Sequence, residues 1–278
     1  MQNAYLLQKV IEQLQPVRGL NAIVLGGSYA SGTHQPDSDL DIGLYYYEKE
    51  PLDTAHIRSI ANSLNDKPAP VVTELGGWGP WVNGGAWLTI QGQRVDFLYR
   101  NIDFVSSTLD DCNRGIIHSD FWQQPAYGFH NFMYCTETVI CRPLYDPGFI
   151  LDPLKAKVSI YSPKLKQAII ERFIGSAKFT FMNTYKSAER GEVYRVTGCL
   201  TRIVHCLILV LYALNETWYL SEKRVAEEID AFRLKPENFI ERSYAILGMT
   251  GTTNGELMAS LKNVEKLYEE IVVLIGTR

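Results

Sequence analysis

The stretch LGGS at residues 25–28 is followed, after ten residues, by DLDI at residues 39–42, and these two stretches decide the fold. An apolar, β-branched run ends at the glycine pair, which predicts a buried strand over 21–25. Glycine lets the backbone approach a ligand closely, and Ser28 is expected to begin a short helical turn that ends at Gly32. Free amide groups at such a helix start, together with a serine hydroxyl, favour an anionic phosphate group. The first stretch therefore predicts a phosphate-binding turn.

The second stretch predicts a strand over 39–47 in which apolar residues alternate with Asp39 and Asp41. Side chains in a strand point to opposite faces with a period of two, so the two aspartates share a face, roughly 6.5–7 Å apart along the strand. That separation suits two metal ions about 3.5–4 Å apart. Magnesium prefers oxygen ligands and is usually held by a few carboxylates together with substrate phosphates. The spacing therefore indicates a magnesium site.

A third carboxylate is expected on a neighbouring strand, and Asp96 in the run 93–99 fits this expectation. The run is rich in β-branched and aromatic residues, where a charge is costly unless it is paired or binds a metal. Each signal has an ordinary explanation when taken alone: a turn for the glycines, a solvated pair for the first two acids, and a salt bridge for Asp96. All three stand in strand-like contexts and in the right order, which favours one joint site.

These residues resemble the nucleotidyltransferase superfamily typified by DNA polymerase β. Its motif is a hydrophobic residue, Gly, Gly or Ser, a loop of about ten residues, and then Asp-hydrophobic-Asp/Glu, with a third acid on a later strand. The resemblance covers about the first hundred residues. It implies that Gly27 and Ser28 bind the nucleotide, and that Asp39, Asp41 and Asp96 are the catalytic residues and the ligands of two Mg²⁺ ions. It also implies a nucleoside triphosphate, with ATP expected, as the co-substrate.

Within the superfamily, the chain looks most like the antibiotic nucleotidyltransferases, two-domain enzymes that transfer AMP to aminoglycosides. The stretch LTRI at 200–203 is expected to open an apolar helix, and SEKRVA at 221–226 follows it, as in the streptomycin/spectinomycin adenylyltransferases. That similarity implies that Lys223 contacts the nucleotide phosphates; the alternative is an exposed lysine at a helix start. The acceptor implied is a hydroxyl group of a small, aminoglycoside-like molecule.

One departure from that subgroup concerns the general base. The subgroup has a glutamate as its third acid, and this glutamate also takes the proton, whereas this chain has the shorter Asp96. The base is therefore Asp96, Glu74 or another group. Glu74 ends the apolar run 71–73, and the alternative interpretation is a surface acid.

The chain is expected to be an α+β protein with two domains. A polymerase-β-like nucleotidyltransferase domain, a mixed sheet backed by helices, is predicted over 1–111. Residues 112–160 are punctuated by proline and glycine and are predicted as an irregular connection. A helical bundle that binds substrate is predicted over 161–278, beginning with Ser162 as helix cap and Pro163 in the first helical position.

The segment 75–87 joins the predicted strands with five glycines and three tryptophans. Tryptophan rings supply stacking surfaces for a ring or an amine, and glycines allow a close-fitting loop. The alternative is a hairpin whose tryptophans pack on the core. The sequence leaves both possibilities open.

Composition restricts the partners and the compartment. The net charge is −4 with a pI of about 5.8, and there is no basic tract, so a nucleic acid is not the expected partner. Five cysteines without a Cys-x-x-Cys pattern argue against a disulfide framework and a structural zinc site. The start of the chain does not resemble a signal peptide, and the longest apolar run, 206–214, is shorter than the ~20 residues of a spanning helix, so a cytoplasmic protein without a membrane partner is expected.

Two other functions remain open from sequence. The chemistry can be the same with a protein side chain or an RNA end as the acceptor, although the acidic pI disfavours RNA. The chain can also be a non-catalytic nucleotide-binding module, although the three acids are all present. The oligomeric state is not predicted.

Overall fold

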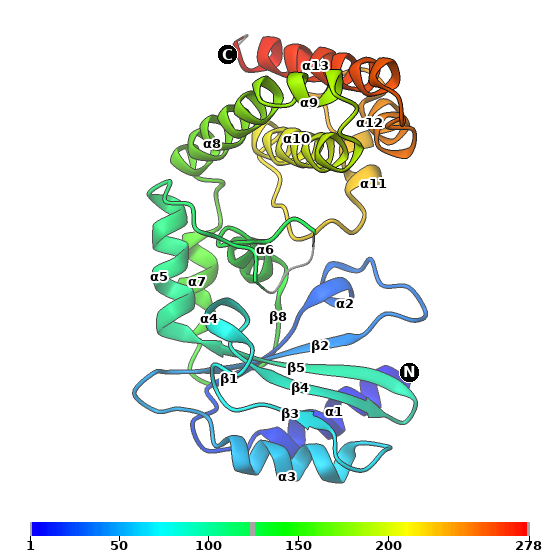
Figure 1. Ribbon diagram of the computed structural model, residues 1–278. Coiled ribbons are helices and arrows are strands. Elements are labelled where there is room, and N and C mark those ends of the chain that lie inside the picture. The colour runs from blue at the N-terminus through cyan, green and yellow to red at the C-terminus, as the bar shows by residue number, and fades with distance from the viewer. Residues whose placement is uncertain (1, 123–125, 277–278) are drawn as a thin grey trace. The chain divides into compact units, whose positions relative to one another are not determined.

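The computed structural model describes residues 2–122 and 126–276 (Figure 1). The chain divides into two compact units. The first consists of Met1–Cys112 and His118–Ile160, and the second of Asn113–Ile117 and Tyr161–Arg278. Most of the segment expected as an irregular connection thus clusters with the first unit.

The first unit is built on a six-stranded sheet with the order β3-β4-β5-β2-β1-β8. β2 and β5 are parallel and the other neighbours are antiparallel, so the expected mixed sheet is confirmed. The strands are β1 (Ala22–Leu25), β2 (Leu40–Tyr46), β3 (Val71–Val72), β4 (Gly85–Ile90), β5 (Gln93–Asn101) and β8 (Arg142–Tyr145).

One face of this sheet is covered by α1 (Gln2–Leu14) and α3 (Thr54–Leu64), as Figure 1 shows. Alternate residues of the central strands, such as Ile42 and Phe97, have no exposed surface and pack with apolar side chains of the two helices. Full burial of an aliphatic or phenylalanine side chain contributes about 1.5–3 kcal/mol, so this face is the core of the unit.

The opposite face of the sheet carries five further helices of the described residues. They are α2 (Gly27–Ser31), α4 (Gly79–Val82), α5 (Ile102–Asn113), α6 (Met133–Ile140) and α7 (Leu151–Lys157). A separate two-stranded ribbon consists of β6 (Ser119–Asp120) and β7 (Phe129–His130). Arg100 on β5 is buried and forms a two-pronged ion pair with Glu137 on α6, with N–O distances of 3.0 and 3.2 Å. This ion pair, between a buried arginine and a half-buried glutamate, fixes α6 to the sheet.

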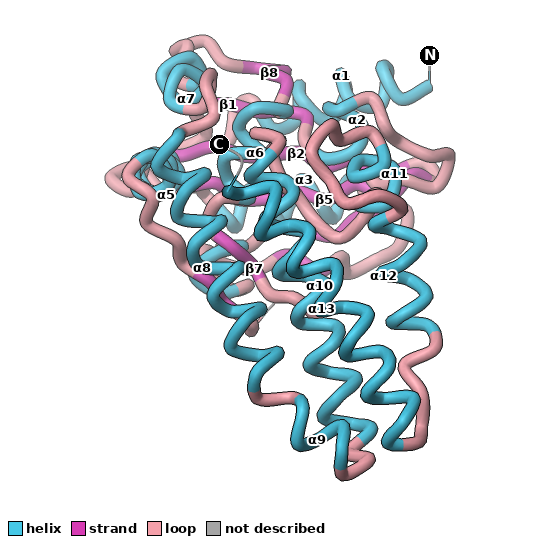
Figure 2. The backbone as a smooth tube through the Cα atoms, turned by 90° about the horizontal axis from the view of Figure 1, so that it is seen from above, coloured by secondary structure: helices cyan, strands magenta, loops and turns pink. Residues whose placement is uncertain are grey.

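The second unit is helical, as predicted. Its helices are α8 (Pro163–Met182), α9 (Tyr185–Glu189), α10 (Val193–Leu214), α11 (Val225–Asp230), α12 (Phe239–Gly248) and α13 (Asn254–Gly276). α10 lies beside both α8 and α13 (Figure 2). Ser162 caps α8 through a hydrogen bond from the Leu165 amide, and Pro163 holds the first helical position.

One helix in the described part of the chain, α10, is long and apolar enough to span a membrane, with a mean hydropathy of 1.8 over 18 residues. Two thirds of that window (67%) is buried inside the protein. A mostly buried core helix has the same length and composition, and the place of α10 between α8 and α13 accounts for its apolar character.

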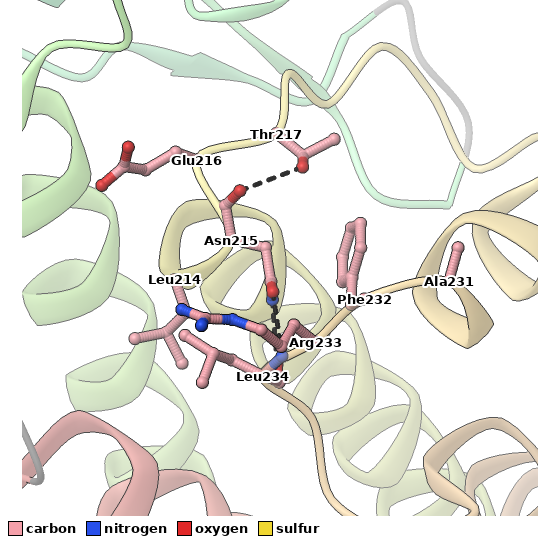
Figure 3. A pocket seen from close by; sticks show the side chains of 8 residues that line it. All are labelled: Leu214, Asn215, Glu216, Thr217, Ala231, Phe232, Arg233 and Leu234. Atoms are coloured by element: carbon pink, nitrogen blue, oxygen red, sulfur yellow. Dashed lines mark hydrogen bonds between the residues drawn. The ribbon is translucent and has the colours of Figure 1, made fainter.

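The second unit also has a cavity of about 440 Å³ where α10 ends (Figure 3). Asn215 crosses it: its side chain accepts a hydrogen bond from the Leu234 amide and donates one to the Leu234 carbonyl. Glu216, on the rim, is ion-paired with Lys166 at 2.7 Å. The Asn215 bonds tie the segment before α12 to the end of α10, and the ion pair ties Glu216 to α8.

Candidate active site

The glycine pair forms the turn between β1 and α2, and it lies against Asp41. The Gly26 amide donates a hydrogen bond to the Asp41 carbonyl at 2.8 Å. Gly27 has a φ of +54°, and a Cβ added there would lie 1.8 Å from Asp41 Oδ2. Both the left-handed backbone and the close approach require glycine at this position.

Ser28 is the second residue of α2 and is half-buried. Within the described residues, it enters the hydrogen bonds of the turn through its carbonyl, which accepts from the Thr33 amide and the Ser31 hydroxyl. The hydroxyl of Ser28 takes no part in these bonds. The turn thus carries a serine hydroxyl one residue after the glycine that packs against Asp41.

The parallel pairing of β2 and β5 sets Asp41 directly opposite Asp96. Their neighbours in the two strands, Leu40 and Ile42 on β2 and Val95 on β5, point into the core, so both acids lie on the other face of the sheet. Neighbouring strands are about 4.7–4.9 Å apart, so the two carboxyl groups lie side by side. The structure brings these two predicted residues together.

Asp39 precedes β2 by one residue, and its carboxylate is held by an arginine. Arg94 Nε lies 2.5 Å from Asp39 Oδ1, and another Arg94 nitrogen donates to the Asp37 carbonyl at 2.6 Å. In the register of the two strands, Leu40 pairs with Val95, so Asp39 falls opposite Arg94. The sequence interpretation did not include Arg94. The strand period of two could have identified it, because Arg94 stands two residues before Asp96 and therefore lies on the same face of the strand.

No three His, Cys, Asp or Glu side chains of the described residues are close enough together to form a metal site. The three predicted acids share a face, but Asp39 is engaged with Arg94 while Asp41 and Asp96 are adjacent. Paired carboxylates are hard oxygen donors of the kind that magnesium takes. The carboxylate oxygens of Asp41 and Asp96 therefore fit a magnesium ion. Asp39 could serve as a further ligand once its ion pair with Arg94 is broken.

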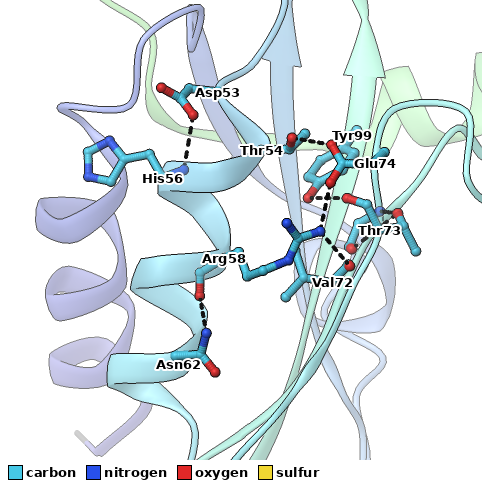
Figure 4. Close-up of polar contacts among 10 residues, drawn as sticks. Asp53, Thr54, His56, Arg58, Asn62, Val72, Thr73, Glu74 and Tyr99 are labelled. Atoms are coloured by element: carbon cyan, nitrogen blue, oxygen red, sulfur yellow. Dashed lines mark hydrogen bonds and ion pairs between the residues drawn. The ribbon is translucent and has the colours of Figure 1, made fainter.

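Glu74 lies away from these acids. Figure 4 shows Arg58 reaching from α3 to the Glu74 carboxylate, with an N–O distance of 2.7 Å. The hydroxyl of Thr54, at the start of α3, donates to the same carboxylate. The hydrogen bonds from Thr54 and Arg58 lower the pKa of Glu74. Because α3 covers the core face, Glu74 is a surface ion-pair residue on the opposite side from Asp41 and Asp96.

The tryptophans of segment 75–87 serve different purposes. Trp81 packs edge-on against Phe104 and near Phe129, and its carbonyl accepts a hydrogen bond from the Tyr134 hydroxyl. Trp78 and Trp87 instead stack on each other with ring centroids 4.8 Å apart. Trp81 therefore packs against other rings of the unit, whereas Trp87 is exposed and the half-buried Trp78 stacks on it.

Lys223 lies in the second unit and is exposed. It belongs to the loop before α11, where its amide donates to the Ser221 hydroxyl at 3.3 Å. The expected helix opening at 200–203 is wrong, because α10 begins at Val193, seven residues earlier. The assignment of Lys223 to the nucleotide phosphates stays a prediction.

Residues 6–106 match the protein-family model described as "Nucleotidyltransferase domain". A nucleotidyltransferase-like protein from Exiguobacterium sibiricum 255-15, known from a crystal structure, is 11% identical, with a TM-score of 0.45 over 97% of this chain and 76% of that one. No curated protein matches the chain. The matched residues include the glycine turn and all three acids. The first unit of this protein therefore contains a nucleotidyltransferase domain.

Proposed function

We propose that the protein transfers AMP from ATP to a hydroxyl group of a small, aminoglycoside-like molecule and releases pyrophosphate. One observation carries this proposal: Asp41 and Asp96 are adjacent on the face of the sheet opposite α1 and α3, and the turn at Gly27 packs against Asp41. A turn suited to phosphates beside two carboxylates is the arrangement that nucleotide transfer requires.

The chain's own residues have separate tasks in this reaction. The amides of the turn and the Ser28 hydroxyl hold the β- and γ-phosphates. Asp41 and Asp96, joined by Asp39, would hold the magnesium beside the turn. The acceptor oxygen attacks the α-phosphorus in line, and pyrophosphate leaves on the opposite side. Magnesium, when bound, neutralises the phosphate charge and lowers the pKa of the attacking hydroxyl.

The proton of the acceptor hydroxyl needs a base close to the reacting oxygen. Asp96 and Glu74 are the two named candidates for this base. Asp96 lies beside Asp41, whereas Glu74 is hydrogen-bonded to Thr54 and Arg58 on the α3 side of the sheet. This placement supports Asp96 as the group that takes the proton through a carboxylate oxygen, directly or by way of a water molecule.

The proposal is tested by substituting Asp41→Asn and measuring pyrophosphate release from ATP with magnesium and a panel of hydroxylated amines. The amide keeps the shape of the side chain but removes its charge, so release is expected to fall to background while the circular dichroism spectrum stays unchanged. Asp152→Asn, an exposed acid at the start of α7, is the matched control and should retain full activity.

Mass analysis of the products separates the remaining alternatives. An AMP adduct of a small molecule supports the proposal, whereas labelling confined to protein or RNA in a lysate assigns the acceptor to that class. Equal activity of Asp41→Asn and the wild type would reject the assignment of the site. ATP binding without any product would identify a nucleotide-binding module.

A further inference from the structure

An exposed tryptophan, Trp87, lies next to the third acid. β4 and β5 are antiparallel, and their register sets Trp87 directly opposite Asp96. Directly opposed residues in such a pair project from the same face, with Cβ atoms about 4.5–5.5 Å apart. Trp87 is 55% exposed, which is unusual for so large an apolar side chain in a strand.

Trp78 supports Trp87 from one side. Its amide donates to the Asn83 carbonyl at 2.8 Å, which closes the loop around α4 and returns Trp78 to the sheet. Gly85, two residues before Trp87, gives it room: a Cβ there would lie 2.9 Å from Trp78 Cζ3. The two rings stack at an interplanar angle of 25°. Trp78 thus covers one part of the Trp87 ring, and the rest of that ring is exposed to solvent.

The strand order shows on which side of the two acids Trp87 lies. From β4 to β1 the order is β4-β5-β2-β1, so the two acids on β5 and β2 lie between Trp87 and the glycine turn that follows β1. In phosphoryl transfer, the attacking and leaving oxygens are in line on opposite sides of phosphorus. If the turn holds the leaving pyrophosphate, the attacking hydroxyl enters from the side of Trp87.

We propose that Trp87, backed by Trp78, is the binding platform for the acceptor, and that the acceptor carries its reactive hydroxyl on a ring that stacks on the indole. This inference rests on the proposed function and adds the place and the chemical class of the second substrate. A flat indole offers a large apolar face to a ring and little to a flexible chain, and its position opposite Asp96 puts the hydroxyl of a stacked ring beside the carboxylates.

Steady-state kinetics of Trp87→Ala and Trp87→Phe test the inference, with Mg-ATP and two sets of acceptors, hydroxylated ring compounds and open-chain polyols. Trp87→Ala should raise the KM for ring acceptors about tenfold, or ~1.4 kcal/mol, while the KM for ATP stays unchanged. Trp87→Phe keeps an aromatic face and should restore most of the loss. Phe149→Ala, which removes an exposed aromatic ring elsewhere in the unit, should match the wild type.

The possible results distinguish failure of the inference from failure of the proposed function. An unchanged KM for ring acceptors in Trp87→Ala would overturn the inference alone. A raised KM for ATP with an unchanged acceptor KM would assign the pair to the nucleobase and overturn it as well.

Binding is followed in parallel through the quenching of tryptophan fluorescence by the same ring compounds. Quenching that disappears in Trp87→Phe supports the platform even where turnover is slow. If the wild type shows neither quenching nor turnover with any ring compound, the inference is wrong. Formation of AMP and pyrophosphate from ATP and water in that sample would leave the proposed chemistry standing, and its absence would remove both.

Discussion

At the scale of single residues, the site is organised by one close contact, that between Gly27 and Asp41. The carboxylate occupies the space where a side chain at Gly27 would be, and the backbone there is left-handed. Glycine at position 27 is therefore required by the geometry of the acid itself. The sequence predicted the glycine turn and the acids, but not that they touch, because the contact depends on how β1 and β2 pair.

The substitution Gly27→Ala tests that contact. The new Cβ would displace the Asp41 carboxylate, so we expect activity to be lost and stability to fall. Gly32→Ala is the matched control, because Gly32 also has a left-handed backbone, with φ of +75°, but open space around it. Gly32→Ala should lose about 1–2 kcal/mol of stability through backbone strain and keep its activity. Equal activity in the two variants, measured by pyrophosphate release alongside thermal unfolding, would contradict the role of the contact.

Arg94 is the residue that sequence reasoning missed, and in the proposed site its ion pair with Asp39 would compete with a metal ion for the same carboxylate. Arg94→Gln should tighten Mg²⁺ binding in the absence of nucleotide by about twofold to fivefold, the equivalent of a surface ion pair of about 0.4–1 kcal/mol. Titration calorimetry measures the affinity. Arg58→Gln, which breaks the ion pair with Glu74 on the other face, is the control and should leave it unchanged. Weaker metal binding in Arg94→Gln would show that the arginine helps to build the site.

At the scale of elements, the sequence predicted the strands that matter for the site. The apolar runs at 21–25, 39–47 and 93–99 correspond to β1, β2 and β5, whose alternation decides which face carries the acids. The pairing of β8 with β1 lay beyond sequence reasoning, because β8 is short, contains Pro143 and joins the sheet only through a partner far away in the chain. Non-local pairing leaves little trace in local periodicity.

The helical elements show the same limit. The periodic pattern from Ser162 predicts one helix as far as Arg190, but α8 ends at Met182 and α9 follows after a short break. The Asn183 side chain donates to the Phe179 carbonyl at 2.8 Å and helps to end α8. Such local side-chain bonds compete with the helix and decide a boundary that apolar spacing alone does not show.

The contact between α12 and α13 has a measurable dependence on pH. Arg242 donates to both oxygens of Glu270, at 2.8 and 2.7 Å, and these bonds lower the pKa of Glu270. A lowered carboxyl pKa stabilises the fold above the ordinary glutamate value of about 4.3, and this stability is lost as the pH falls through the lowered pKa. Glu270→Gln should therefore cost about 0.5–1 kcal/mol at pH 7 and almost nothing in strong acid.

Urea unfolding at several pH values measures this difference, with Glu269→Gln on the neighbouring exposed residue as the control. The control should match the wild type at every pH. A cost of Glu270→Gln that stays constant as the pH falls would mean that its bonds to Arg242 do not contribute through charge.

At the scale of the whole molecule, the protein combines a mixed-sheet unit that contains a nucleotidyltransferase domain with a helical unit. The sequence indicated the first unit because the glycine pair and the acids stand at a characteristic spacing. The helical unit has no comparable constraint, and its periodic apolar residues predict a bundle without specifying a ligand. Aminoglycoside-like acceptors, ATP as donor and a cytoplasmic location therefore remain predictions.

The central claim is that Asp41 and Asp96, joined by Asp39, hold divalent metal beside the glycine turn. A crystal structure with manganese in place of magnesium and a non-hydrolysable ATP analogue tests it most directly, because anomalous scattering locates the metal. We expect metal about 2.0–2.3 Å from oxygens of Asp41 and Asp96, with the phosphates on the turn at Gly27 and Ser28 and Asp39 released from Arg94. Metal and triphosphate bound away from these carboxylates, with the Asp39–Arg94 pair intact, would contradict the account.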